Sequence, residues 1–176
     1  MKKIWTIGHS TRGENEFIEI LDSCHIQVLA DVRSYPGSKK FPHFNKPHLA
    51  AALDAHSIEY IHLSELGGRR KALKDSKNTA WNNEAFRGFA DYMETESFKI
   101  GIEKLIDIAK LKNTAYMCSE AVWWRCHRSL ISDYLKSKGW EVLHIMGINK
   151  TQSHPFTSPA RVVQGVLDYT KNVNSA

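Results

Sequence analysis

Short β-like runs alternate with stretches of helical periodicity along the whole chain. Five apolar runs are the expected strands: residues 4–7, 28–32, 59–63, 114–117 and 142–145. Strands that alternate with helices are typical of βαβ units, in which successive strands lie parallel. The pattern therefore predicts a single domain over residues 1–176. We expect an α/β, three-layer fold with a mainly parallel sheet of about five strands.

Helical spacing of apolar residues occurs between these strands. The first stripe, which predicts a helix packed on one side, consists of Phe17, Ile20, Leu21 and Cys24. Further helices are expected over residues 49–56, in two pieces within 82–112, and from 130 to a stop at Gly139. Ser158 followed by Pro159 is a strong pair of helix-starting residues. They predict a last helix with an apolar face of Val162, Val163, Val166 and Leu167.

The composition is that of a folded globular protein. Hydrophobic residues make up 42% of the chain and charged residues 24%, which excludes disordered and fibrous classes. No apolar run approaches the roughly 18 residues of a membrane-spanning helix, and the start reaches Gly8 after too few apolar residues for a secretion signal. We therefore expect a cytoplasmic protein with no membrane partner. Cys24, Cys118 and Cys126 are then expected to be thiols rather than a disulfide framework.

Positive charge gathers in two loops. Twenty-four Lys and Arg residues against nineteen Asp and Glu residues leave a net charge of +5. Much of this excess lies in residues 33–46 and 69–77, and each loop follows an expected strand. The first loop carries the aromatic Tyr35, and the second begins with Arg69, whose guanidinium can address phosphate. We expect an anionic partner, either a small molecule or a nucleic acid.

Polar and ionisable residues follow every expected strand at its carboxyl end. The set comprises His9 and Ser10, Asp31 and Arg33, residues 62–69, residues 118–120, and His144. The carboxyl ends of parallel strands meet at one edge of an open sheet, where such folds bind ligands. These residues are therefore expected to share one pocket.

Two residues after the fourth strand offer nucleophilic or acid–base chemistry. Cys118 precedes a loop that runs into a helix, where backbone amides and the helix dipole lower a thiol pKa. A small buried cysteine is the alternative. The spacing from Cys118 to Arg125 is C-x6-R, which differs from the C-x5-R of cysteine phosphatases. A persulfide carrier needs no such spacing. Glu120 is a candidate general acid, base or nucleophile, or else an ion-pair partner of a nearby arginine.

The helix after this loop begins with His127 and Arg128. His127 is in phase with the apolar residues of that helix, so it either lines the pocket or faces the core, and Arg128 is the better candidate for binding a ligand. Trp123 and Trp124 suit either base stacking or core packing. The cysteines lack metal-ligand spacing and the glycines match no dinucleotide or Walker fingerprint, so the sequence predicts neither a metal nor a cofactor.

Several motifs, spread over nearly the whole chain, resemble one known family. They are Thr6-Ile7-Gly8-His9-Ser10, Asp31-Val32-Arg33-Ser34-Tyr35-Pro36, residues 41–45, residues 60–69, Met117-Cys118-Ser119-Glu120, and Cys126-His127-Arg128-Ser129. With these motifs the chain resembles the domain of unknown function 488 family. The resemblance implies a compact Rossmann-like α/β fold, with the motif residues as the site, and no established reaction.

Three functions fit such a pocket. The first is an enzyme that acts on a nucleotide, nucleic acid or other phosphorylated substrate. In it, Arg33, Arg69 and Arg128 hold anionic groups, while Asp31, Glu120 or Cys118 does the chemistry and His9 orients either side. The second is a non-catalytic nucleic-acid-binding or regulatory module. The third is a persulfide or redox carrier that uses Cys118.

Overall fold

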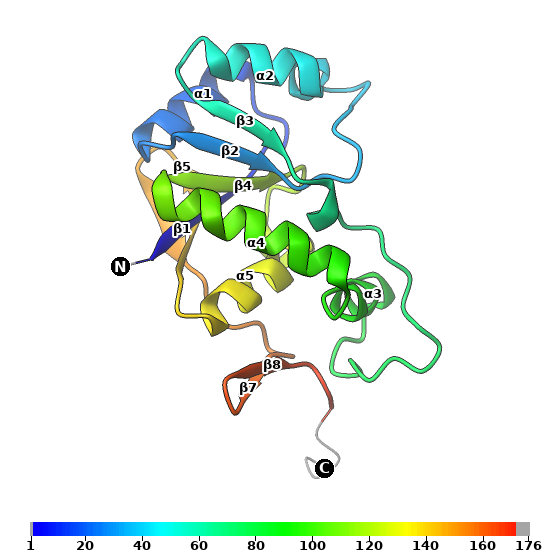
Figure 1. The fold of residues 1–176 in the computed structure, drawn as a ribbon. Coiled ribbons are helices and arrows are strands. Elements are labelled where there is room, and N and C mark those ends of the chain that lie inside the picture. Colours follow the sequence, from blue (N-terminus) through cyan, green and yellow to red (C-terminus); the bar gives the residue numbers. More distant parts are fainter. Residues whose placement is uncertain (1, 172–176) are drawn as a thin grey trace.

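The computed structural model describes residues 2–171 and has a mixed α/β architecture (Figure 1). The helices are α1 (Glu14–Ser23), α2 (Lys46–Asp54), α3 (Glu84–Tyr92), α4 (Glu96–Leu111) and α5 (Arg128–Ser137). The strands are β1 (Lys3–Gly8), β2 (Val28–Asp31), β3 (Glu59–His62), β4 (Thr114–Cys118), β5 (Glu141–Gly147), β6 (Lys150–Ser153), β7 (Arg161–Val163) and β8 (Val166–Asp168). Short 3-10 turns occupy Pro42–Phe44 (η1), Ser64–Leu66 (η2) and Trp123–Arg125 (η3).

The central sheet confirms the predicted fold class. Its strand order is β3-β2-β4-β1-β5-β6, and every neighbouring pair from β3 to β5 is parallel. The sixth strand, β6, is antiparallel to β5 and was not among the predicted strands. All four of its residues are exposed, so this edge strand carries none of the apolar alternation that marks a half-buried strand.

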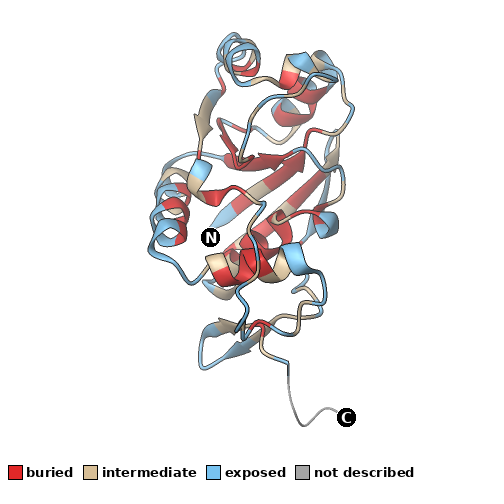
Figure 2. Ribbon diagram, turned by 90° about the vertical axis from the view of Figure 1, so that its right-hand side faces the viewer, coloured by how far each residue is buried: buried red, intermediate tan, exposed pale blue. Residues whose placement is uncertain are grey.

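Helices cover both faces of the sheet, as the three-layer prediction requires (Figure 1). On one face α1 and α2 contribute Phe17, Leu21 and Leu53 to a buried cluster. On the other face a second cluster contains Phe98 of α4 and Leu130 of α5. Figure 2 shows the central strands as the most continuously buried part of the ribbon, which is typical of a parallel sheet covered on both sides.

The predicted last helix is wrong, because the segment forms the β7–β8 hairpin (Figure 1). Gln164 and Gly165, between the two strands, have φ values of 50° and 77°. Two successive residues in the left-handed region make the tight turn that joins antiparallel strands. β-branched valines at 162, 163 and 166 favour extended backbone, and Ser158 and Pro159 lie in a turn before the hairpin.

The predicted helix at residues 49–56 begins earlier than expected. α2 starts at Lys46 and ends at Asp54, with Pro47 in its first turn. Pro at the start of a helix is favourable because its missing N–H would have had no partner there. The first basic loop is therefore shortened by both η1 and the start of α2. Within residues 2–171, no helix is long and apolar enough to cross a membrane.

Gly8 ends β1 directly against the loop that follows β4. A Cβ at this position would overlap the carbonyl oxygen of Glu120, so Gly8→Ala must displace backbone. We expect the free energy of unfolding to fall by about 3 kcal/mol, measured by chemical denaturation. Gly13→Ala is the matched control, because a Cβ there meets no atom within 4 Å. Since Gly13 is the N-cap of α1, where Gly is preferred to Ala, we expect a loss of no more than about 1 kcal/mol. Equal losses in the two variants would contradict this account.

Candidate functional site

A pocket with a volume of about 620 Å³ lies at the carboxyl edge of the sheet. This volume is within the usual range for small-molecule sites. Nine of the predicted site residues line it: His9, Ser10, Arg33, Tyr35, Arg69, Cys118, Glu120, Arg125 and His127. The other lining residues include Lys40, Phe41, Phe86 and Cys126. The remaining two predicted residues, Asp31 and Arg128, are buried behind the lining.

Asp31 and Arg33 form a buried ion pair in one wall of the pocket. The Arg33 side chain donates to the two Asp31 carboxylate oxygens at 2.9 and 2.8 Å, and the hydroxyl of Tyr60 donates to the same carboxylate at 2.5 Å. Arg33 also donates to the carbonyl oxygen of Phe44 at 2.7 Å. Its charge is therefore matched within the protein. In this arrangement Asp31 holds Arg33 in place and faces no ligand.

His9 is a neutral member of the same wall. Its Nδ1 donates to the carbonyl oxygen of Ser10 at 2.8 Å, so Nε2 is left to accept from Arg33 at 3.4 Å. The ring stacks on Phe44 with centroids 4.2 Å apart. Burial, reinforced by the charge of Arg33, lowers the pKa of His9 to about 4 although the Ser10 hydrogen bond opposes the shift. The ring therefore stays uncharged near neutral pH.

Two thiols form the floor of the pocket, and a buried guanidinium lies beneath them. Arg128, 1% exposed, donates from Nε to the sulfur of Cys118 at 2.9 Å and from its backbone N–H to the sulfur of Cys126 at 3.4 Å. Another guanidinium nitrogen donates to the carbonyl oxygen of Glu120 at 2.8 Å. The structure thus places Arg128 beneath the thiols instead of on the pocket lining. Arg125, considered for the C-x6-R motif, lies at the exposed rim.

Cys126 has an imidazole beside it. The Nε2 of His127 lies 3.1 Å from the carbonyl oxygen of Val32 and 3.0 Å from that of Leu66. Both partners are acceptors, so Nε2 carries the proton and Nδ1 is free to accept. Nδ1 lies 3.5 Å from the sulfur of Cys126. A thiol, a base and groups that orient the base are the parts of an activated cysteine nucleophile.

The two thiols ionise as a coupled pair. Burial and a hydrogen bond to Cys126 raise the pKa of Cys118 well above its usual value. Burial also disfavours a charge on Cys126, but the hydrogen bond from Cys118 and the charge of Arg128 outweigh it and lower the pKa of Cys126 to about 7. Loss of a proton from the pair is therefore favoured at Cys126, where the charge of Arg128 stabilises a thiolate.

The rim of the pocket carries the exposed cations. Lys40, Arg69 and Arg125 line the pocket from three separate segments, and no ion pair involves them in the described part of the chain. Arg69 lies over the ring of Tyr35, with 5.8 Å between guanidinium carbon and centroid. Glu120 is the exposed carboxyl of this lining.

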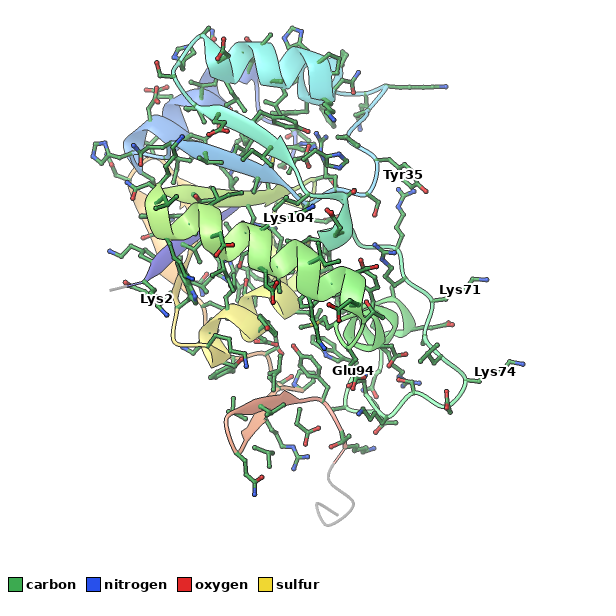
Figure 3. All side chains as sticks on the ribbon, in the orientation of Figure 1. Lys2, Tyr35, Lys71, Lys74, Glu94 and Lys104 are labelled. Carbon is green, nitrogen blue, oxygen red and sulfur yellow. The ribbon has the colours of Figure 1, made fainter. Side chains whose placement is uncertain are left out.

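The second basic loop contributes less charge to the pocket than its composition indicates. In Figure 3, Lys71 and Lys74 project away from the body of the protein. Lys77 forms an ion pair with Glu94 at 2.8 Å. Of this loop's cations, Arg69 is therefore the one that reaches the pocket lining.

Sequence reasoning singled out Cys118 but did not include Cys126, which also lines the pocket. The available signal was the dipeptide Cys126-His127 at the start of a helix, where a thiol, an imidazole and a helix dipole coincide. Within residues 2–171, no group of three or more His, Cys, Asp or Glu side chains is arranged to hold a metal ion.

Comparison with known proteins identifies one family. The model of the family described as "Domain of unknown function DUF488" matches residues 14–135, which include β2, β4 and the floor of the pocket. No curated protein and no solved structure is significantly similar to the chain. The matched segment spans well over half of the 176 residues and agrees with the resemblance found in the motifs. The chain belongs to the DUF488 family.

Proposed function

We propose that the protein is an enzyme that uses a cysteine thiolate to act on a phosphorylated substrate of about nucleotide size. The observation that carries this proposal is the pair Cys118 and Cys126 on the floor of the pocket, held against the buried Arg128. An unpaired rim of cations and a reactive centre below it are the two parts that such an enzyme requires.

Cys126 is the nucleophile in this proposal. His127 takes the thiol proton at Nδ1. Because burial lowers the pKa of His127, it then donates this proton to the leaving group. The thiolate forms a bond to the electrophilic atom of the substrate, while the leaving group departs with the electron pair of the broken bond. A water molecule deprotonated by the Glu120 carboxylate then releases the adduct and restores the thiolate.

The rim binds the phosphate group. Lys40, Arg69 and Arg125 stand on three segments around the opening, and guanidinium groups can each give two parallel hydrogen bonds to a phosphate. Tyr35, Phe41 and Phe86 add aromatic surface to the same lining, which suits a planar base. A cavity of about 620 Å³ accommodates a nucleotide-sized ligand.

A persulfide carrier is the second candidate, because a second thiol lies next to Cys126. With thiosulfate as donor, the thiolate would take up one sulfur atom and sulfite would leave. Mass spectrometry of the intact protein detects this addition. A stable persulfide on Cys126, with no turnover of phosphorylated compounds, would favour the carrier over the enzyme.

The rim makes a prediction about binding. Arg125→Ala should weaken the binding of inorganic pyrophosphate and nucleoside monophosphates by about tenfold, because it removes a charged hydrogen bond to phosphate. Isothermal titration calorimetry measures the dissociation constants. Lys74→Ala is the control, since it removes an exposed cation that projects away from the body of the protein (Figure 3). The rim assignment fails if both variants weaken binding equally or if the wild type binds neither probe.

The thiol pair makes a prediction about reactivity. In a Cys24→Ser background, alkylation of Cys126 by iodoacetamide should increase with pH around a midpoint of about 7. Cys118→Ala should raise this midpoint because the thiolate loses its donor, whereas Cys118→Ser retains a donor and should change it less. Peptide mass spectrometry reports the rate at each site. A midpoint near the ordinary cysteine value in the wild type would refute Cys126 as the nucleophile.

A further inference from the structure

A chain of buried hydrogen bonds leads from the thiol floor along the face of the sheet that α5 covers. A guanidinium nitrogen of Arg128 donates to the hydroxyl of Thr6 at 2.9 Å, and that hydroxyl lies 2.7 Å from Nδ1 of His144. Nε2 of His144 lies 2.8 Å from Nδ1 of His154, and Nε2 of His154 lies 2.9 Å from the Asp133 carboxylate. All five side chains are at most 2% exposed.

The elements that carry the chain explain why it can form. Thr6 on β1 and His144 on β5 are direct register partners in the sheet. His154 follows β6, and its backbone N–H donates to the carbonyl oxygen of Val142 on β5 at 2.9 Å. Arg128 and Asp133 both belong to α5, which covers this part of the sheet (Figure 1). The path therefore leaves α5, crosses two strands and returns to the same helix.

The protons in this chain have one consistent arrangement when both imidazoles are neutral. Asp133 accepts, so His154 carries its proton on Nε2 and accepts at Nδ1. His144 must then donate from Nε2 and accept at Nδ1 from the hydroxyl of Thr6. Each donor thus points away from Arg128 and toward Asp133. Burial, together with the charge of Arg128, lowers the pKa of His144 to about 2, so this ring stays neutral.

Both ends of the chain are fixed. Asp133 also accepts from the backbone N–H of Thr157 at 2.9 Å and from the hydroxyls of Thr157 and Tyr169 at 2.5 and 2.7 Å. The ring of His144 is stacked on Trp123, with centroids 4.6 Å apart and an interplanar angle of 3°. Neither the carboxylate nor the imidazole can turn without breaking these contacts.

We propose that Thr6, His144, His154 and Asp133 form a positioning chain that holds the Arg128 guanidinium against Cys118 and so sets the reactivity of the thiol pair. The proposal rests on the thiol pair being the reactive centre proposed above. None of these four residues belongs to the pocket lining. They act through Arg128, whose orientation decides whether its Nε faces the sulfur of Cys118.

Other ionisable groups also face the thiols and the guanidinium. His127 faces the thiols from the start of α5. Tyr116 on β4 and Arg12 after β1 face Arg128. A change in the thiol midpoint is therefore attributed to the chain only where a variant leaves all of these groups in place and changes no formal charge.

Thr6→Val meets this condition, because it replaces a hydroxyl by a methyl group of similar size. One guanidinium nitrogen of Arg128 then loses its acceptor, and the hydrogen bond from Arg128 Nε to the sulfur of Cys118 weakens. In the Cys24→Ser background we expect the alkylation midpoint of Cys126 to rise by about one pH unit, which slows alkylation at pH 7 roughly fivefold. Thr6→Ser retains the hydroxyl and should restore the wild-type midpoint. A folded Thr6→Val variant with an unchanged midpoint would overturn the proposal, even if it melts at a lower temperature.

A measurement on the wild-type protein keeps the proposal testable if Thr6→Val does not fold. Nitrogen-15 spectra of the histidine rings assign the proton to Nδ1 or Nε2. We expect His144 and His154 both to carry it on Nε2, without protonation of His144 between about pH 6 and 9. A proton on Nδ1 of His144 would break the direction of the chain and overturn the proposal.

Failure of this proposal is distinguishable from failure of the proposed function. Pyrophosphate binding at the rim does not involve the chain, so Thr6→Val should bind it as the wild type does. If the wild type does not bind pyrophosphate, while the Thr6→Val midpoint and the histidine spectra are as expected, the phosphorylated substrate alone is refuted. Normal rim binding with an unchanged midpoint in Thr6→Val would refute the positioning chain alone.

Discussion

The buried guanidinium of Arg128 is the interaction on which the rest of the site depends. Removing such a charge from water costs several kcal/mol unless nearby groups compensate. Here the compensation comes from the sulfur of Cys118, the hydroxyl of Thr6 and the carbonyl oxygen of Glu120. These partners belong to β1, to β4 and to the loop after β4. One cation thus fixes the shape of the loop, the place of the thiols and the packing of α5 on the sheet.

The sequence was sufficient to predict the edge of the sheet at which the site lies. Alternating strands and helices imply parallel strands, and parallel strands bring their carboxyl ends together. His9, Arg33 and Cys118 therefore meet in one pocket although they are far apart in the chain. The last helix was mispredicted because Ser158-Pro159 is a strong local helix start. The strand preference of the valines and the turn at Gln164-Gly165 decided the structure.

The roles of individual side chains could not be predicted in the same way. Asp31 looked like an acid–base candidate, but three hydrogen bonds from Arg33 and one from Tyr60 engage it. Thr6 and His144 are separated by 138 residues, and only the pairing of β1 with β5 makes them neighbours. Such contacts depend on strand order and side-chain rotamers. Periodicity determines neither of these.

Cations on two sides of the thiols suit the proposed thiolate and the proposed anionic substrate in one pocket. Two negative charges about 5 Å apart repel by roughly 3 kcal/mol at an effective dielectric constant near 20. Arg128 lies behind the thiols and donates to both sulfurs, so it compensates the charge of the proposed thiolate from the protein side. Lys40, Arg69 and Arg125 stand in front and face an incoming anion. Had Arg128 lined the pocket, it would have paired with the substrate and left the thiolate uncompensated. Its burial therefore serves the proposed chemistry better than exposure would.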